Sequence, residues 1–223
     1  MTTNRGGLRL VYSGSSQGWI TATAGNDAKA NTAQFVTATG GTITTSGNFK
    51  IHTFNSDANF VVSNGGNSCG SNTVDYLVVA GGGAGAVGEW GGGGGGAGGY
   101  RESSGGASGC YSASPLGSGV SALTVTAQTY PISVGAGGAG GTANPYTTNG
   151  DGDSGSNSVF STITSAGGGG AGGGNQPAGG PPSCQAVGNG KAGGSGGGGS
   201  GPGGAPVSGS NFGAGNTPPV SPP

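Results

Sequence analysis

The sequence predicts an all-β protein in which a small N-terminal antiparallel β part is followed by a polyglycine II helix bundle with interspersed short strands. Short apolar runs separated by turn residues recur through the first 80 residues, a pattern typical of antiparallel strands. The 223 residues include 60 glycines, which are concentrated after a valine-rich run at residues 74–80. Only 30% of the residues are hydrophobic, so backbone hydrogen bonds must contribute more than usual to stability.

The first element is a hairpin near the N-terminus. Leu8, Leu10 and Tyr12 share one face of an alternating run. Residues 13–18 have the composition of a turn, and residues 19–21 supply the second strand.

The next elements form the antiparallel β part. Residues 42–44 and 49–54 predict a hairpin around the turn residues 46–48. Residues 60–62 and 74–80 predict two more strands. Four short strands of this kind suffice for a small sheet or sandwich.

Strand patterns return only briefly within the glycine part. Residues 123–126, 130–134 and 159–163 each predict a short strand. The last two end near glycine blocks that begin at Gly135 and Gly167. The expected repeat is therefore a strand, a polyglycine segment and a variable loop.

Glycine at this density is typical of flexible linkers, but its spacing favours ordered extended helices with three residues per turn. Such helices have no internal hydrogen bonds, so they bond to neighbours that no side chain holds apart. We expect valine at Gly91 and Gly94 to separate these neighbours. The glycines in threefold register are those at 82, 85, 88, 91 and 94, at 135, 138 and 141, at 167, 170 and 173, and at 193, 196 and 199.

The charges and apolar runs exclude several function classes. The formal net charge is −1, and the six Lys and Arg residues are scattered, so no nucleic-acid partner is expected. The longest apolar run, residues 76–80, is too short for membrane insertion. The single histidine, His52, has no metal or acid–base partner nearby in the sequence, so we expect a strand residue. We therefore expect no enzyme, no catalytic residue and no cofactor.

The three cysteines, Cys69, Cys110 and Cys184, are widely spaced and contain no CxxC pair. This pattern predicts neither a zinc site nor a disulfide framework. Free thiols are the expected state, and a bridge between Cys110 and Cys184 is the alternative.

Asp151 and Asp153 are weak candidates for a metal site, because oxygen side chains alternate with glycine around them. However, Ser154 stands where a calcium loop of the EF-hand type requires glycine, and Phe160 stands where it requires glutamate. The sequence favours a tight turn over residues 149–155, and no metal is expected.

Five aromatic residues of the glycine part are candidates for receptor binding, because a thin glycine bundle has little interior in which to bury them. The alternative is that they pack flat on the bundle or between subunits. They are Trp90, Tyr100, Tyr111, Tyr146 and Phe212.

Several of these motifs occur together, and in this order, in a known domain type. Residues 41–44, 49–54, 60–62 and 74–83 resemble the glycine-rich domain of tailed-bacteriophage virion proteins. The later runs at residues 98–101, 130–138 and 157–163 continue that resemblance. Residues 8–12 and 18–20 are similar to short modules of marine, especially cyanobacterial, phage structural proteins.

The resemblance implies a protein of the virion, in a tail fibre or an adhesin-like appendage. It implies an N-terminal attachment hairpin module at 1–35, an antiparallel β domain at 36–80 and a glycine-rich polyglycine II domain with a Pro-rich tail at 81–223. In the adhesins of this type, variable loops on the glycine bundle touch the host receptor.

The expected partners are therefore other virion proteins, further copies of the chain and a host cell-surface receptor. A trimer assembled through residues 1–80 is favoured, and the loops expected to bind are 101–116, 142–150 and 175–190. The main alternative is a structural appendage or self-assembling filament without receptor binding. An ice-binding protein is less favoured, because the glycine blocks differ in length.

Overall fold

The fold is described from a computed structural model of the chain. The described residues are 10–12, 19–21, 32–88, 91–103, 120–142, 150–174, 188–200 and 211–216. Within them the structure contains strands and extended segments but no helices, and every strand pair is antiparallel. The predicted all-β class is therefore confirmed. Nothing helical in this part of the chain is long and apolar enough to span a membrane.

Both predicted N-terminal hairpins are present. β1 (Leu10–Tyr12) pairs with β2 (Trp19–Thr21). β4 (Thr42–Ser46) pairs with β5 (Phe49–Thr53) around Gly47, whose φ of 57° suits the left-handed position of a tight turn. Turn chemistry in the sequence was sufficient to predict these local pairings.

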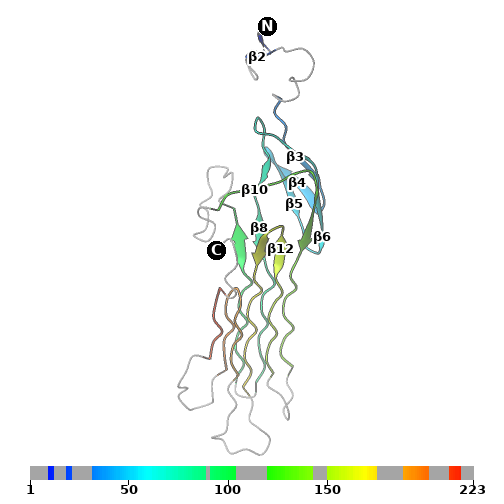
Figure 1. Cartoon of the computed structure of the whole chain (residues 1–223). Coiled ribbons are helices and arrows are strands. Elements are labelled where there is room, and N and C mark those ends of the chain that lie inside the picture. The colour runs from blue at the N-terminus through cyan, green and yellow to red at the C-terminus, as the bar shows by residue number, and fades with distance from the viewer. Residues whose placement is uncertain are drawn as a thin grey trace, which may run out of the picture.

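The largest sheet joins strands from both sides of residue 80 (Figure 1). Its order is β13-β12-β11-β6-β3. β6 is the longest strand of this sheet, and it places Phe60 opposite Tyr130 of β11. The five strands are β3 (Val36–Thr39), β6 (Ala58–Gly65), β11 (Thr129–Ser133), β12 (Ser158–Phe160) and β13 (Ile163–Ser165).

The single strand predicted at 159–163 is wrong, because a hairpin occupies this stretch. β12 and β13 are joined by a turn at Ser161 and Thr162. Ser161 has a φ of 55°, a left-handed conformation that ends the first strand. The residue pattern alone did not reveal this reversal, because serine is uncommon at such positions.

The single strand predicted at 74–80 is also wrong. It is divided into β7 (Thr73–Val74) and β8 (Leu77–Val79), which pair with β10 (Leu123–Thr124) and β9 (Tyr100–Glu102). At the break, Ser103 Oγ accepts from Tyr76 N at 3.1 Å and donates to Asp75 Oδ1 at 2.7 Å. This serine replaces a backbone partner at the point where the chain changes neighbours.

The hydrophobic core packs against the five-stranded sheet and has an aromatic centre. Phe60, Tyr130 and Phe160 are buried, and their ring centroids are 6.0–6.4 Å apart. Val62 and Ile163 are 2% and 3% exposed beside them. Two of the three central rings therefore come from strands that lie within the glycine-rich half of the sequence.

The glycine segments continue directly from strands and run side by side away from the sheet (Figure 1). β8, β11 and β13 each lead into a segment, and two other segments lead into β9 and β12. The segments that adjoin strands are 80–88, 91–99, 134–142, 150–157 and 166–174, and segments 188–200 and 211–216 lie beside them.

Candidate functional site

The glycine segments are joined by hydrogen bonds that recur every three residues. The N–H groups of Ala80, Gly83 and Ala86 donate to carbonyl oxygens of segment 91–99 at 2.8–3.1 Å. Antiparallel β-strands repeat their pairing every two residues instead. The period of three shows that these segments are not bonded as a β-sheet.

The same segment is bonded on further sides. The N–H groups of the residues that follow these three, Gly81, Ala84 and Val87, donate to segment 150–157 at 2.7–3.1 Å. Carbonyl groups of segment 80–88 also accept bonds from segment 134–142. A strand in a sheet has neighbours in one plane only, so the glycine segments form a three-dimensional bundle rather than a layer.

Segment 166–174 is the centre of this bundle. All of its residues are buried, and Ala171 has no exposed surface. Backbone hydrogen bonds connect it to segments 80–88, 91–99, 150–157 and 188–200. Buried backbone groups are costly unless they are bonded, and the surrounding segments meet this requirement.

A row of polar side chains completes the bonding of the central segment. Three side-chain oxygens of segment 150–157, spaced three residues apart, accept hydrogen bonds from three N–H groups with the same spacing. This polar ladder pairs Asn157, Ser154 and Asp151 with Gly167, Gly170 and Gly173, at 2.9, 3.1 and 2.7 Å. The side-chain oxygens of the ladder supply acceptors that the carbonyl groups of one more neighbouring segment would otherwise have to provide.

Glycine is required at some positions of segment 91–99 and not at others. A β-carbon at Gly93, Gly95 or Gly96 would overlap a backbone carbonyl oxygen of an adjacent segment. A β-carbon at Gly94 would meet nothing within 4 Å. Exposed Ala97 follows Gly94 by three residues and faces the same open side.

The expectation that Gly91 and Gly94 hold neighbouring segments together is therefore wrong. Neither position has a neighbour within 4 Å of an added β-carbon, although Gly91 has a φ of 112° that disfavours other residues. In segment 91–99, two of every three residues face other segments and the third faces solvent. In the register at 82–94, a β-carbon at Gly82, Gly85, Gly91 or Gly94 meets no atom closer than 3.7 Å. The other three registers, at 135, 138 and 141, at 167, 170 and 173, and at 193, 196 and 199, fall on positions where a β-carbon would overlap a neighbouring backbone, as expected.

Asp151 and Asp153 have separate partners. Asp151 belongs to the polar ladder, whereas Asp153 Oδ1 lies 3.5 Å from Lys191 Nζ. Lys191 Nζ also donates to Gly152 O at 2.9 Å. The tight turn expected at 149–155 is wrong for the described residues 150–155, which are extended. Among the described residues, no three His, Cys, Asp or Glu side chains form a group suited to a metal ion.

Two of the five candidate aromatic residues lie in the described part of the chain. Tyr100 is half-buried on β9, and its hydroxyl donates to Glu102 Oε2 at 2.7 Å. Phe212 is 69% exposed on segment 211–216. Trp90, Tyr111 and Tyr146 lie outside the described residues.

The histidine and the described cysteine are both in the β part. His52 Nδ1 lies 2.8 Å from Gly40 O, and its ring packs edge-on against Phe60 at 5.1 Å. His52 therefore lies on strand β5, as the sequence predicts. Cys69 is an exposed free thiol, and the other two cysteines lie outside the described residues.

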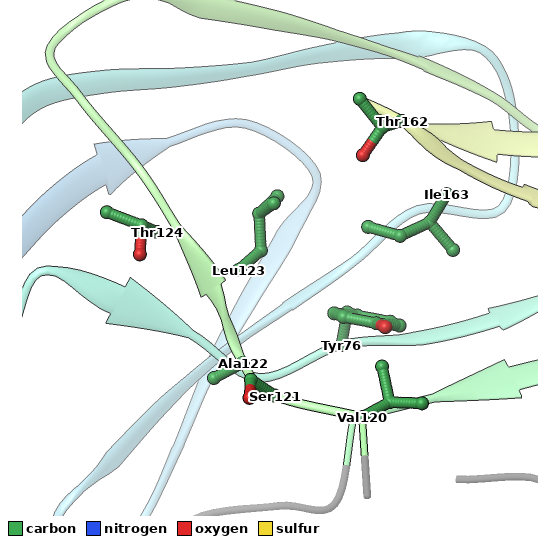
Figure 2. A pocket seen from close by; sticks show the side chains of 8 residues that line it. All are labelled: Tyr76, Val120, Ser121, Ala122, Leu123, Thr124, Thr162 and Ile163. Atoms are coloured by element: carbon green, nitrogen blue, oxygen red, sulfur yellow. The ribbon is translucent and has the colours of Figure 1, made fainter. Parts of the chain in front are cut away.

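A shallow recess of about 360 Å³ opens beside β10 (Figure 2). Leu123, Ile163 and Val120 make its lining mainly apolar, and Thr162 adds a hydroxyl. Burial raises the pKa of the Tyr76 hydroxyl above its ordinary value, so this group stays protonated at neutral pH. The recess offers apolar contact and hydroxyl groups, but no charged side chain lines it.

The sequence model of a family described as a glycine-rich domain matches residues 68–220. This match spans more than half of the chain. The chain belongs to the glycine-rich domain family. No curated protein and no solved structure matches it.

The glycine-rich domain defined by this match contains more than glycine segments. It begins before β7 and includes β8 to β13. It therefore supplies Tyr130, Phe160 and Ile163 to the hydrophobic core. Its bundle and the five-stranded sheet are continuous parts of one structure.

The loops expected to bind are flanked by residues at opposite ends of the glycine-rich domain. Ser103, which precedes residues 104–119, donates its N–H to Tyr76 O beside the sheet. Gly150, which follows residues 143–149, forms a bridge with Val87 at the far end of the bundle. Gly173, close to residues 175–187, also lies at that far end.

Proposed function

We propose that this chain is a phage virion structural protein, a tail-fibre or adhesin-like appendage. Its N-terminal part attaches to the particle, and the bundle carries loops that bind a host-cell receptor. The observation that supports this best is the hydrogen-bond period of three residues with neighbours on several sides. It suits a stiff projecting scaffold that depends little on a hydrophobic core.

We propose further that the segments are polyglycine II helices. A helix with three residues per turn directs successive N–H groups about 120° apart. The bonds from 80, 83 and 86 to one neighbour, and from 81, 84 and 87 to another, follow this geometry. The buried positions without β-carbons provide the close approach that such helices need.

The proposed receptor-binding end is the one opposite the sheet. Binding residues are often found in loops that a rigid scaffold positions. The stretches 143–149 and 175–187 are flanked by described residues at this end, whereas 104–119 is flanked by residues beside the sheet. Tyr146 is therefore our first candidate for receptor contact, followed by exposed Phe212.

Tyr146→Ala is expected to reduce adsorption of the particle to host cells about 10-fold, because an aromatic contact in a receptor interface contributes on the order of 1.4 kcal/mol or more. Tyr111→Ala is the matched variant, since its stretch is flanked at the sheet end, and it should adsorb normally. Adsorption and the amount of chain per particle are measured together. Normal adsorption by Tyr146→Ala, or loss of assembly instead, would favour a structural appendage or filament without receptor binding.

We also propose that the chain forms a homo-oligomer, with a trimer favoured, through residues 1–80. The β4–β5 hairpin supports this, because Ile43, Phe49 and Ile51 are 45–50% exposed on it. Open strand edges and exposed apolar side chains promote association.

Phe49→Thr combined with Ile51→Thr is expected to convert the full-length trimer to monomer, as measured by light scattering at micromolar concentration. Val87→Thr is the control, because this residue is 41% exposed and lies outside residues 1–80. A wild-type chain that is monomeric under these conditions would contradict the proposed oligomer.

A further inference from the structure

Arg101 is a buried cation at the junction of the sheet and the bundle. It is the middle residue of β9, opposite Val78 of β8, and only 7% of it is exposed. An arginine side chain carries a positive charge. Its guanidinium must therefore be stabilised by acceptors or by a negative charge.

The guanidinium is bonded unevenly. Nη1 donates to Tyr100 O at 3.0 Å, whereas Nη2 reaches Asn216 Oδ1 only at 3.4 Å. Nε is buried and has no hydrogen-bond partner. Nε and Nη2 form one edge of the planar group, and two parallel N–H bonds point outward from that edge. One whole edge of this buried guanidinium is thus unbonded or weakly bonded.

No described carboxylate is paired with this edge. Within the described part of the chain, the ion pair is that of Lys191 with Asp153. Glu102 follows Arg101 on the strand, so its side chain projects from the opposite face, where it accepts from the Tyr100 hydroxyl. A buried charge without a counter-charge is costly.

We propose that the Nε and Nη2 edge of Arg101 binds a carboxylate group of a molecule outside this chain. A carboxylate has two oxygens at the spacing that this edge requires, and such paired contacts are stronger than bonds to a neutral amide. Asn216 is exposed, and its neutral Oδ1 accepts from Nη2 at a long 3.4 Å, so an incoming carboxylate can replace it as the partner of Nη2. This site is independent of the proposed receptor-binding end.

The test measures the thermal unfolding midpoint of the full-length protein in sodium acetate and in sodium chloride at equal ionic strength. The wild-type midpoint is expected to rise with acetate beyond its rise with chloride, because a ligand that binds the folded state stabilises it. Arg101→Met should abolish this difference. Lys191→Met should retain it, because that lysine already has a carboxylate partner.

Two further variants keep the test decisive if Arg101→Met does not fold. Arg101→Lys retains the charge but not the paired edge, and should weaken acetate binding at least 10-fold. Asn216→Ala removes the side chain bonded to Nη2 and should strengthen acetate binding. Sodium glucuronate distinguishes the sources of the carboxylate: tighter binding than acetate indicates an acidic sugar, and equal binding indicates the carboxylate alone. An equal response of wild type to acetate and chloride, or a full acetate response in Arg101→Lys, would overturn the proposal.

Discussion

Gly96→Ala is expected to lower the free energy of unfolding by about 3 kcal/mol or more. Gly96 is buried, and a β-carbon there would overlap the carbonyl oxygen of Ser195. Both groups belong to backbones fixed by hydrogen bonds, so the clash can be relieved only by moving segments 91–99 and 188–200 apart. Overpacking of this kind typically costs about 1–3 kcal/mol before any hydrogen bond is lost.

Gly94→Ala is the matched control, because it lies two residues away in the same segment. A β-carbon at Gly94 meets nothing within 4 Å, so we expect a change within about 0.5 kcal/mol. Urea unfolding of both variants, followed by circular dichroism, measures the difference. Equal stabilities of the two variants would refute the proposed close packing of the glycine segments.

Phe160→Ala is expected to destabilise the protein by about 3–5 kcal/mol, the usual range for removing a buried aromatic ring. The ring packs against Phe60, Tyr76 and Tyr130 at centroid distances of 6.0–6.5 Å. Since Phe60 and Tyr130 lie on different strands of the same sheet, the loss should weaken the whole sheet. Thermal unfolding measured by tyrosine fluorescence and by far-ultraviolet circular dichroism should shift together.

Phe35→Ala provides the comparison for this variant. Phe35 is 64% exposed, so its removal should change stability by less than about 1 kcal/mol. If Phe160→Ala unfolded in two separate steps, the sheet and the glycine segments would not form one cooperative unit.

Local features of the fold were predictable, and long-range ones were not. The hairpin around Gly47 depends on residues close together in sequence, and its turn chemistry is visible there. The pairing of β6 with β11 joins residues about 70 positions apart, such as Phe60 and Tyr130, and no local pattern specifies it. Where the 74–80 run is divided, the partner of Tyr76 and Asp75 is Ser103, which lies 27 residues beyond Tyr76 in the sequence.

The site was predictable to a smaller extent. Threefold spacing correctly indicated a structural period of three residues. Three of its four registers fall on residues that face a neighbour, but the register at 82–94 falls mostly on the open side. Gly96 and Gly94 are identical in sequence terms and differ only in what surrounds them. The residues around Asp151 in the sequence suggest a metal ligand, whereas its partner in the structure is the N–H of Gly173. The sequence gives no sign that Arg101 is buried without a carboxylate partner, because that arrangement arises only in the folded state.

The three-residue bonding period has a mechanical consequence. The segments run parallel to one long axis, and their hydrogen bonds lie across it (Figure 1). A pull along that axis loads many of these bonds in shear at the same time, so no single bond fails first. A sideways pull would instead peel one segment away, breaking its hydrogen bonds one after another. We therefore expect the bundle to resist tension between its two ends far better than force applied to its flank.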